Sequence, residues 1–247
     1  SKVKICLKRS IVMMKNNKQK LIFVAIDTSN IKQVKKIISQ TKTKKLKIIP
    51  KFGLQFFYSK NGRKFLENYK SEYWLDIKGH DIPQTVVSAL DSLKDLKKLR
   101  YITVHASGGL EMLKTVTKKA RQINKSIRIL VVTILTSLNN KSVKELGYKD
   151  KVEKIVLKQA ALIKKSGAAG CVCSAKEAKL IRKKYKNFFI VTPGIKLPGD
   201  KNNWDQTRIE TPANAFKNNV SAIVIGRSLV GSGNIKNNLK RLIDHLS

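Results

Sequence analysis

Short runs of apolar residues recur along the chain from residue 21 onward. Eight runs, rich in β-branched and aromatic side chains, lie at 21–26, 46–49, 73–77, 101–105, 127–132, 169–173, 188–191 and 221–225. They are largely continuous rather than alternating between apolar and polar positions. Such runs indicate strands that are buried on both faces, as in a parallel sheet.

Between these runs, apolar residues recur at the spacing of a helix. Ile31, Val34, Ile37 and Ile38 form one such stripe, and a second occupies 152–163. Eight strands alternating with helices predict an α/β fold, a (β/α)₈ TIM barrel formed as a single domain by residues 21–247. A doubly wound open sheet is the structural alternative, but no G-x-G-x-x-G follows the first run.

Residues 1–20 differ from the rest of the chain. They contain seven lysines and arginines and no acidic residue. Their apolar stretch, 10–14, is too short for the apolar region of a signal peptide. We therefore expect a basic, disordered N-terminal arm that carries no information about function.

The charge of the whole chain is extreme. Its 247 residues include 52 lysines and arginines against 16 acidic residues, a formal net charge of +36. Such an excess is typical of nucleic-acid binding. Only nine of these residues are arginines, however, whereas sites that grip phosphates and base edges favour the planar guanidinium. We therefore expect solvated surface lysines and no nucleic-acid partner.

Other partners are also constrained by composition. No apolar run approaches the roughly 18 residues needed to span a bilayer, so no membrane association is expected. Three cysteines form no disulfide framework, which favours a reducing compartment, the cytoplasm. Cys171 and Cys173 lack further cysteines or histidines nearby, so the pair is a poor zinc site and no metal is expected.

If the fold is a barrel, its chemistry should lie at the C-terminal ends of the strands. Polar and charged residues do follow strand after strand there. The candidates at these positions are Asp27, Lys51 and the segments 76–78, 103–105, 135–137, 192–195 and 226–228.

The densest signal is the motif D-x-K-x-x-D. Strand spacing places Asp76 and Lys78 on one face, and Lys51 can reach them from the neighbouring strand. Asp81 begins the next helix, with Pro83 suited to its first turn. An alternating array of lysines and aspartates can hold a lysine charged and aimed at a developing carbanion. Helix capping by Asp81 is the simpler alternative.

These residues resemble the signature of orotidine 5′-phosphate decarboxylases, in which D-x-K-x-x-D is followed by I-P-x-T. The resemblance extends in order over nearly the whole chain after the basic arm. Its further segments are 23–27, 51–53, 104–109, 132–137, 171–175, 192–195, 205–206 and 224–227.

This resemblance implies decarboxylation of orotidine 5′-monophosphate to uridine 5′-monophosphate in pyrimidine biosynthesis, without a cofactor. It implies that Lys78 protonates carbon 6 of the pyrimidine, with Asp76 and Asp81 on either side of it. It also implies a homodimer, in which Asp81, Ile82 and Thr85 of each subunit reach into the active site of the other subunit. The substrate-binding residues implied by the resemblance are Asp27, Lys51, Ile82, Thr85, Thr136, Pro193, Lys196, Gln206, Gly226 and Arg227. Lys196 stands where the family usually has arginine.

Two other functions remain open from the residues. On a related barrel, D-x-K-x-x-D serves a magnesium-dependent enediolate reaction of a sugar phosphate. A barrel that binds nucleic acid or acts as a scaffold through its surplus lysines is the non-enzymatic alternative.

Overall fold

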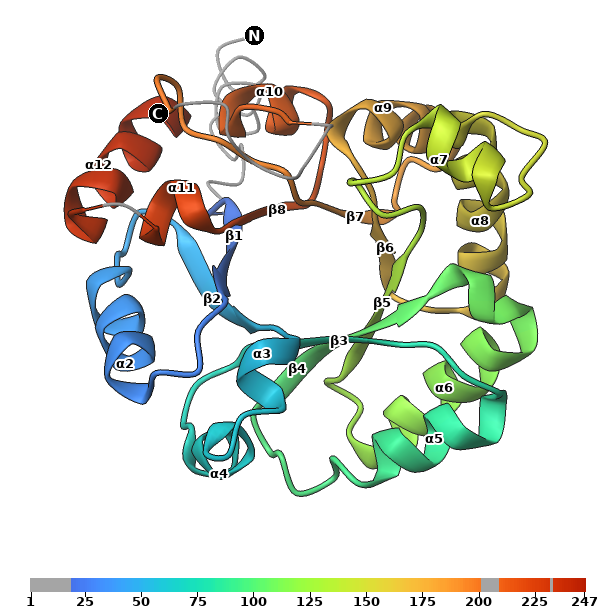
Figure 1. The fold of residues 1–247 in the computed structure, drawn as a ribbon, viewed down its shortest axis with the longest axis horizontal. Coiled ribbons are helices and arrows are strands. Elements are labelled where there is room, and N and C mark those ends of the chain that lie inside the picture. The colour runs from blue at the N-terminus through green and yellow to red at the C-terminus, as the bar shows by residue number, and fades with distance from the viewer. Residues whose placement is uncertain (1–18, 201–208, 232) are drawn as a thin grey trace, which may run out of the picture.

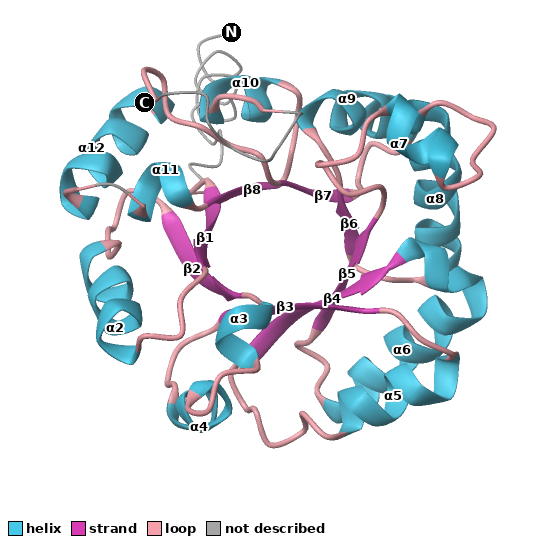
Figure 2. Cartoon of the chain, viewed as in Figure 1, coloured by secondary structure: helices cyan, strands magenta, loops and turns pink. Residues whose placement is uncertain are grey.

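The computed structural model describes residues 19–200, 209–231 and 233–247. Eight parallel strands close into a barrel, and helices surround it as an outer ring (Figures 1 and 2). The strands are β1 (Leu21–Ile26), β2 (Lys47–Phe52), β3 (Tyr73–Gly79), β4 (Leu99–His105), β5 (Arg128–Val132), β6 (Gly170–Val172), β7 (Phe189–Thr192) and β8 (Ala222–Ile225). The predicted TIM barrel is thus confirmed, and the open sheet is excluded because β1 pairs with both β2 and β8.

The helices follow the strands in sequence. They are α2 (Ile31–Gln40), α3 (Leu54–Phe57), α4 (Gly62–Asn68), α5 (Pro83–Asp91), α6 (Gly109–Ile123), α7 (Asn140–Glu145), α8 (Val152–Ser166), α9 (Ala175–Lys184), α10 (Pro212–Lys217), α11 (Arg227–Val230) and α12 (Ile235–Leu246), with a short 3₁₀ turn at Ala106–Gly108. Both helices expected from apolar stripes are confirmed, as α2 and α8. None of the described helices is long and apolar enough to cross a membrane.

Buried apolar residues form two clusters, one inside the barrel and one between the strands and the surrounding helices. In β1, Ile22, Val24 and Ile26 pack toward the helices, whereas Phe23 and Ala25 point into the barrel. This is the alternation that the strand repeat of two residues imposes. Inside, the Phe23 ring packs edge-on against the rings of Trp74 and Tyr101, with centroids 4.8 and 5.0 Å away. The interior of the barrel is therefore filled by side chains at this level.

Local sequence signals begin and end the helices. The Asn30 side chain accepts hydrogen bonds from two backbone amides at the start of α2, and Ser174 with Glu177 forms a capping box on α9. Gly167 ends α8 in the left-handed conformation that glycine adopts without steric cost. Because the eight strands are parallel, their carboxyl ends all lie at one face of the barrel.

The basic arm predicted for residues 1–20 lies outside the described residues, except for Gln19 and Lys20. The prediction of its disorder therefore stays a prediction.

Candidate functional site

A cavity of about 610 Å³ opens at the C-terminal ends of the strands. It brings together eight of the residues predicted from sequence: Asp27, Lys51, Asp76, Lys78, Thr136, Pro193, Gly226 and Arg227. Apolar side chains from the inner barrel layer, among them Val132, Val172 and Val224, complete its wall. The cavity thus has an apolar wall with a few charged groups at its edge, as ligand sites commonly do.

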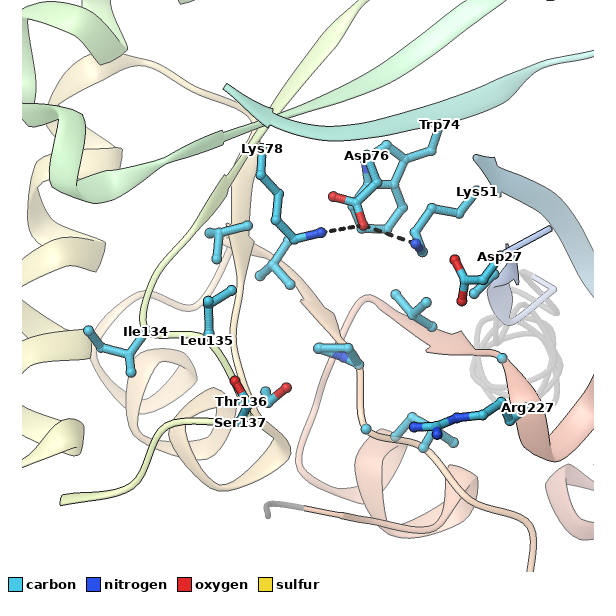
Figure 3. Close-up of a pocket in the computed structure, with 18 residues that line it drawn as sticks. Asp27, Lys51, Trp74, Asp76, Lys78, Ile134, Leu135, Thr136, Ser137 and Arg227 are labelled. Atoms are coloured by element: carbon cyan, nitrogen blue, oxygen red, sulfur yellow. Dashed lines mark hydrogen bonds and ion pairs between the residues drawn. The ribbon is translucent and has the colours of Figure 1, made fainter. Parts of the chain in front are cut away.

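Two lysines share one carboxylate oxygen at the centre of the site. The Nζ atoms of Lys51 and Lys78 each donate a hydrogen bond to Oδ2 of Asp76, and both distances are 2.9 Å. Figure 3 shows the two ammonium groups on either side of the Asp76 carboxylate, with Asp27 beyond Lys51. Three members of the predicted charge array therefore meet within one chain.

Asp76 is ionised in this setting. Its side chain is only 8% exposed, and this burial by itself would raise its pKa. The charges of Lys51 and then Lys78, together with their hydrogen bonds, outweigh burial and lower the pKa from 3.8 to about 2. At neutral pH the centre therefore consists of one buried negative charge between two positive ones.

An irregularity in β3 aims Lys78. The pairing of β3 with β4 shifts in register between Leu75 and Gly79, as at a β-bulge. Lys78 lies inside this interval with a φ of 49°, a left-handed conformation that is uncommon for residues other than glycine. Gly79 follows, and a Cβ there would lie 3.3 Å from Val86 Cγ1. Strained backbone of this kind is concentrated at functional sites, where the surrounding fold holds it in place.

Two residues that support the charged centre were not predicted as site residues. Trp74 lines the cavity, its Nε1 donates a 2.6 Å hydrogen bond to Thr103 Oγ1, and Lys51 Nζ lies 5.8 Å from its ring centroid. The same strand spacing that paired Asp76 with Lys78 also places Trp74 on their face. At Gly53, a Cβ would lie 3.1 Å from Asp27 Oδ1, so a larger residue there would crowd the Asp27 carboxylate.

A guanidinium lies at the other end of the cavity. Arg227 begins α11 directly after β8, and Figure 3 shows it across the cavity from Lys78. Gly226 precedes it, where a Cβ would come within 3.3 Å of Ala25 Cβ. Thr136 and Ser137 lie in the loop after β5, on a further side of the cavity (Figure 3). The cavity therefore has a cationic end distinct from the Lys–Asp–Lys centre.

The remaining predicted residues lie elsewhere in the single chain. Ile82 is 68% exposed, Thr85 is exposed in the first turn of α5, and the Asp81 carboxylate accepts a hydrogen bond from the Ile82 amide. None of these three residues lines the cavity within this chain. Lys196 is buried and is also absent from the cavity lining, and Gln206 falls outside the described residues. Their predicted roles stay predictions.

The distribution of possible metal ligands is also informative. Within the described ranges, no three histidine, cysteine or acidic side chains come together as a group that could hold a metal ion.

His80 and His105 lie near Lys78 with ring centroids 5.5 Å apart. Burial, followed by the charges of His80 and Lys78, lowers the pKa of His105. Its surroundings at the end of β4 therefore favour the neutral form of His105.

Comparison with known proteins agrees with this geometry. The model of the orotidine 5′-phosphate decarboxylase / HUMPS family matches residues 20–242. The orotidine 5′-phosphate decarboxylase of Coxiella burnetii is 36% identical over 217 residues, which cover 85% of this chain and 90% of that protein. The enzyme of the same name from Fusobacterium nucleatum is 34% identical over 221 residues, covering 87% and 91% of the two chains.

A solved structure extends this likeness to the whole fold. The crystal structure of orotidine 5′-phosphate decarboxylase from Lactobacillus acidophilus superposes with a TM-score of 0.77 at 29% identity, covering 93% of this chain and 100% of that one. Fold, cavity residues and sequence similarity therefore agree that the chain belongs to the orotidine 5′-phosphate decarboxylase / HUMPS family.

Proposed function

We propose that the chain is a carboxy-lyase that converts orotidine 5′-monophosphate to uridine 5′-monophosphate in pyrimidine biosynthesis, without a cofactor. The observation that carries the proposal is the buried Asp76 carboxylate between two ammonium groups, with Arg227 across the same cavity. The names of the similar proteins support the same reaction.

In the proposed reaction, the bond between carbon 6 of the pyrimidine and its carboxylate breaks, and its electron pair remains on carbon 6. A proton from Lys78 Nζ forms the new carbon–hydrogen bond as carbon dioxide leaves. Lys78 becomes a neutral amine in this step and regains its proton from solvent. Asp76 orients Lys78 beforehand, because its carboxylate accepts a 2.9 Å hydrogen bond from Lys78 Nζ.

The other cavity residues supply binding energy away from the reacting carbon. We assign the ribose hydroxyls to Asp27 and Lys51, the base to Thr136 and Pro193, and the phosphate to Arg227 with the Gly226 amide. By resemblance to the family, we also assign Lys196 and Gln206 to phosphate binding. A guanidinium suits a phosphate because its planar fork of donors matches two phosphate oxygens. Energy from such a remote dianion can be used to orient the reacting groups.

The proposed enzyme is a homodimer in which Asp81, Ile82 and Thr85 complete the site of the other subunit. The 68% exposure of Ile82, an apolar residue four positions from Lys78, supports this assignment, since burial against a second copy would remove that surface from water. Asp81 would then become the fourth member of the charge array.

Mixing two inactive variants tests this arrangement. Lys78→Ala and Asp81→Ala chains, combined in equal amounts, unfolded and refolded together, should recover about a quarter of wild-type turnover. Half of the dimers are then mixed, and each mixed dimer has one intact site. Turnover equal to the average of the two separate variants would show that Asp81 acts within its own chain. Lys94→Ala mixed with wild type serves as the control for refolding.

The reaction itself is tested by following the absorbance change of orotidine 5′-monophosphate with the purified chain, with and without EDTA. We expect equal turnover in both. Loss of turnover with EDTA would contradict a cofactor-free reaction. Magnesium-dependent turnover of a sugar phosphate, with none of this nucleotide, would favour the enediolate chemistry. No turnover in either condition, together with a salt-dependent mobility shift of duplex DNA, would favour the nucleic-acid function.

A further inference from the structure

A hydrogen-bonded cluster, here called the α11 clamp, joins the loop after β7 to α11 and α12. It consists of Asp200, Ser228 and Arg241. The Ser228 hydroxyl donates to Asp200 Oδ2 and accepts a 2.8 Å hydrogen bond from the Leu197 amide. Arg241 Nη2 donates to Asp200 Oδ1 at 2.9 Å and to the Pro198 carbonyl oxygen at 2.8 Å. The loop after β7 is therefore tied at one point to two consecutive helices, through residues 28 and 41 positions further along the chain.

The helix that the clamp holds, α11, is too short to be stable without contacts to the rest of the protein. With four residues, α11 has few backbone hydrogen bonds of its own, and a single helical turn is unstable in isolation. From the other side, Asn238 of α12 donates a 3.1 Å hydrogen bond to the Leu229 carbonyl oxygen, and Arg241 Nη1 donates to Asn238 Oδ1. Ser228 and Asn238 are both buried, where unmade hydrogen bonds are costly.

The α11 clamp is adjacent in the chain to a residue that lines the cavity. Ser228 directly follows Arg227, which lines the cavity, so whatever fixes Ser228 also fixes the backbone that carries the guanidinium. Arg241 also balances the negative charge of Asp200 through an ion pair.

We infer that the α11 clamp positions Arg227 for the substrate phosphate, with Asp200 as its central positioning residue. This inference rests on the proposed function, because it requires a phosphate at Arg227. Asp200 acts through Arg227 and does not itself contact the substrate. A displacement of about 1 Å in a binding group can cost as much as 10²-fold in rate, so loss of the clamp should be visible in kinetics.

A double-mutant cycle tests the inference on kcat/KM for orotidine 5′-monophosphate. Asp200→Ala alone should lower kcat/KM by about tenfold. In an Arg227→Ala background, the same change should lower it by less than about twofold, because the group that Asp200 positions is already gone. Asp150→Ala is the control: Asp150 pairs with Lys154 and Lys158 outside the cavity, and its loss should leave kcat/KM unchanged.

The outcomes separate the inference from the proposed function. Equal losses in both backgrounds would show a general structural role, and no loss in the single variant would show no role; either result overturns the inference. A wild-type chain without turnover would instead overturn the proposed function, and the inference with it. If Asp200→Ala does not fold, as judged by circular dichroism, Arg241→Gln removes the same contact from α12 and completes the cycle.

Discussion

Replacement of Lys78 by alanine is expected to lower turnover of orotidine 5′-monophosphate by at least roughly 10³-fold, within the range of positioned general acids. Lys78 is the cation that the bulge in β3 directs into the cavity, at 2.9 Å from Asp76. Lys51 bonds the same oxygen from the adjacent strand, and Arg227 lies across the cavity, so neither occupies the place of the lost ammonium group.

Two controls make the Lys78→Ala result specific. Lys94→Ala removes an exposed lysine that pairs with Asp91 outside the cavity, and it should retain full turnover. Binding of uridine 5′-monophosphate, measured by calorimetry, should survive in Lys78→Ala, because the end of the cavity that carries Arg227 is unchanged. Undiminished turnover in a folded Lys78→Ala chain would remove Lys78 from the role of proton donor.

The second large effect is expected for Asp76→Asn, which should lose both activity and stability. The neutral amide leaves the ammonium groups of Lys51 and Lys78 close together with no negative charge between them. Turnover should fall by at least roughly 10²-fold, since the carboxylate that orients Lys78 is gone. The free energy of unfolding should fall by roughly 2 kcal/mol, the value that corresponds to lowering the Asp76 pKa from 3.8 to about 2.

The pH dependence of this stability difference has a definite sign. Because the pKa of Asp76 is lower in the folded chain, its stabilisation is fully present above the unfolded pKa of 3.8 and is lost as pH falls through about 2. Urea unfolding of wild type and Asp76→Asn should therefore differ by a constant amount between about pH 5 and pH 8. The difference should begin to shrink below about pH 4 and vanish below about pH 2. A difference that persists unchanged in acid would show that the carboxylate charge is not its cause.

Asp91→Asn is the matched control for burial. Asp91 also pairs with two lysines, Lys94 and Lys119, and hydrogen bonding to Lys119 lowers its pKa, but it lies at the surface. Solvent screens such exposed pairs, so we expect little change in stability and none in turnover. A loss as large as that of Asp76→Asn would show that burial is not what makes the Asp76 centre strong.

The barrel could be predicted because each of its strands is a continuous apolar run that is visible in the local sequence. The eight apolar runs match β1 to β8, with boundaries that differ by a few residues. The largest difference is β2, which continues beyond Ile49 through Pro50 to Phe52, because β1 pairs with it along its whole length. A proline normally ends such a run, and only the neighbouring strand shows that it does not here.

The candidate site was predictable where it depends on strand spacing. A repeat of two residues places Asp76 and Lys78 on one face, and the barrel rule places Asp27, Lys51 and Arg227 at the same mouth. That Lys51 and Lys78 meet on one oxygen depends on the left-handed backbone at Lys78, which no local pattern signals. Trp74 was missed because an aromatic residue in a strand is normally interpreted as core.

The sequence by itself determined the barrel, the motif on β3 and the family resemblance, because each depends on residues close together in the chain or on their order. Only the tertiary structure decided which charges touch. It pairs Lys51 with Asp76 across 25 residues, and Asp200 with Arg241 across 41. The physical reason is that a hydrogen bond depends on where two atoms lie to within a few tenths of an ångström, and closure of the barrel, not spacing along the chain, determines that.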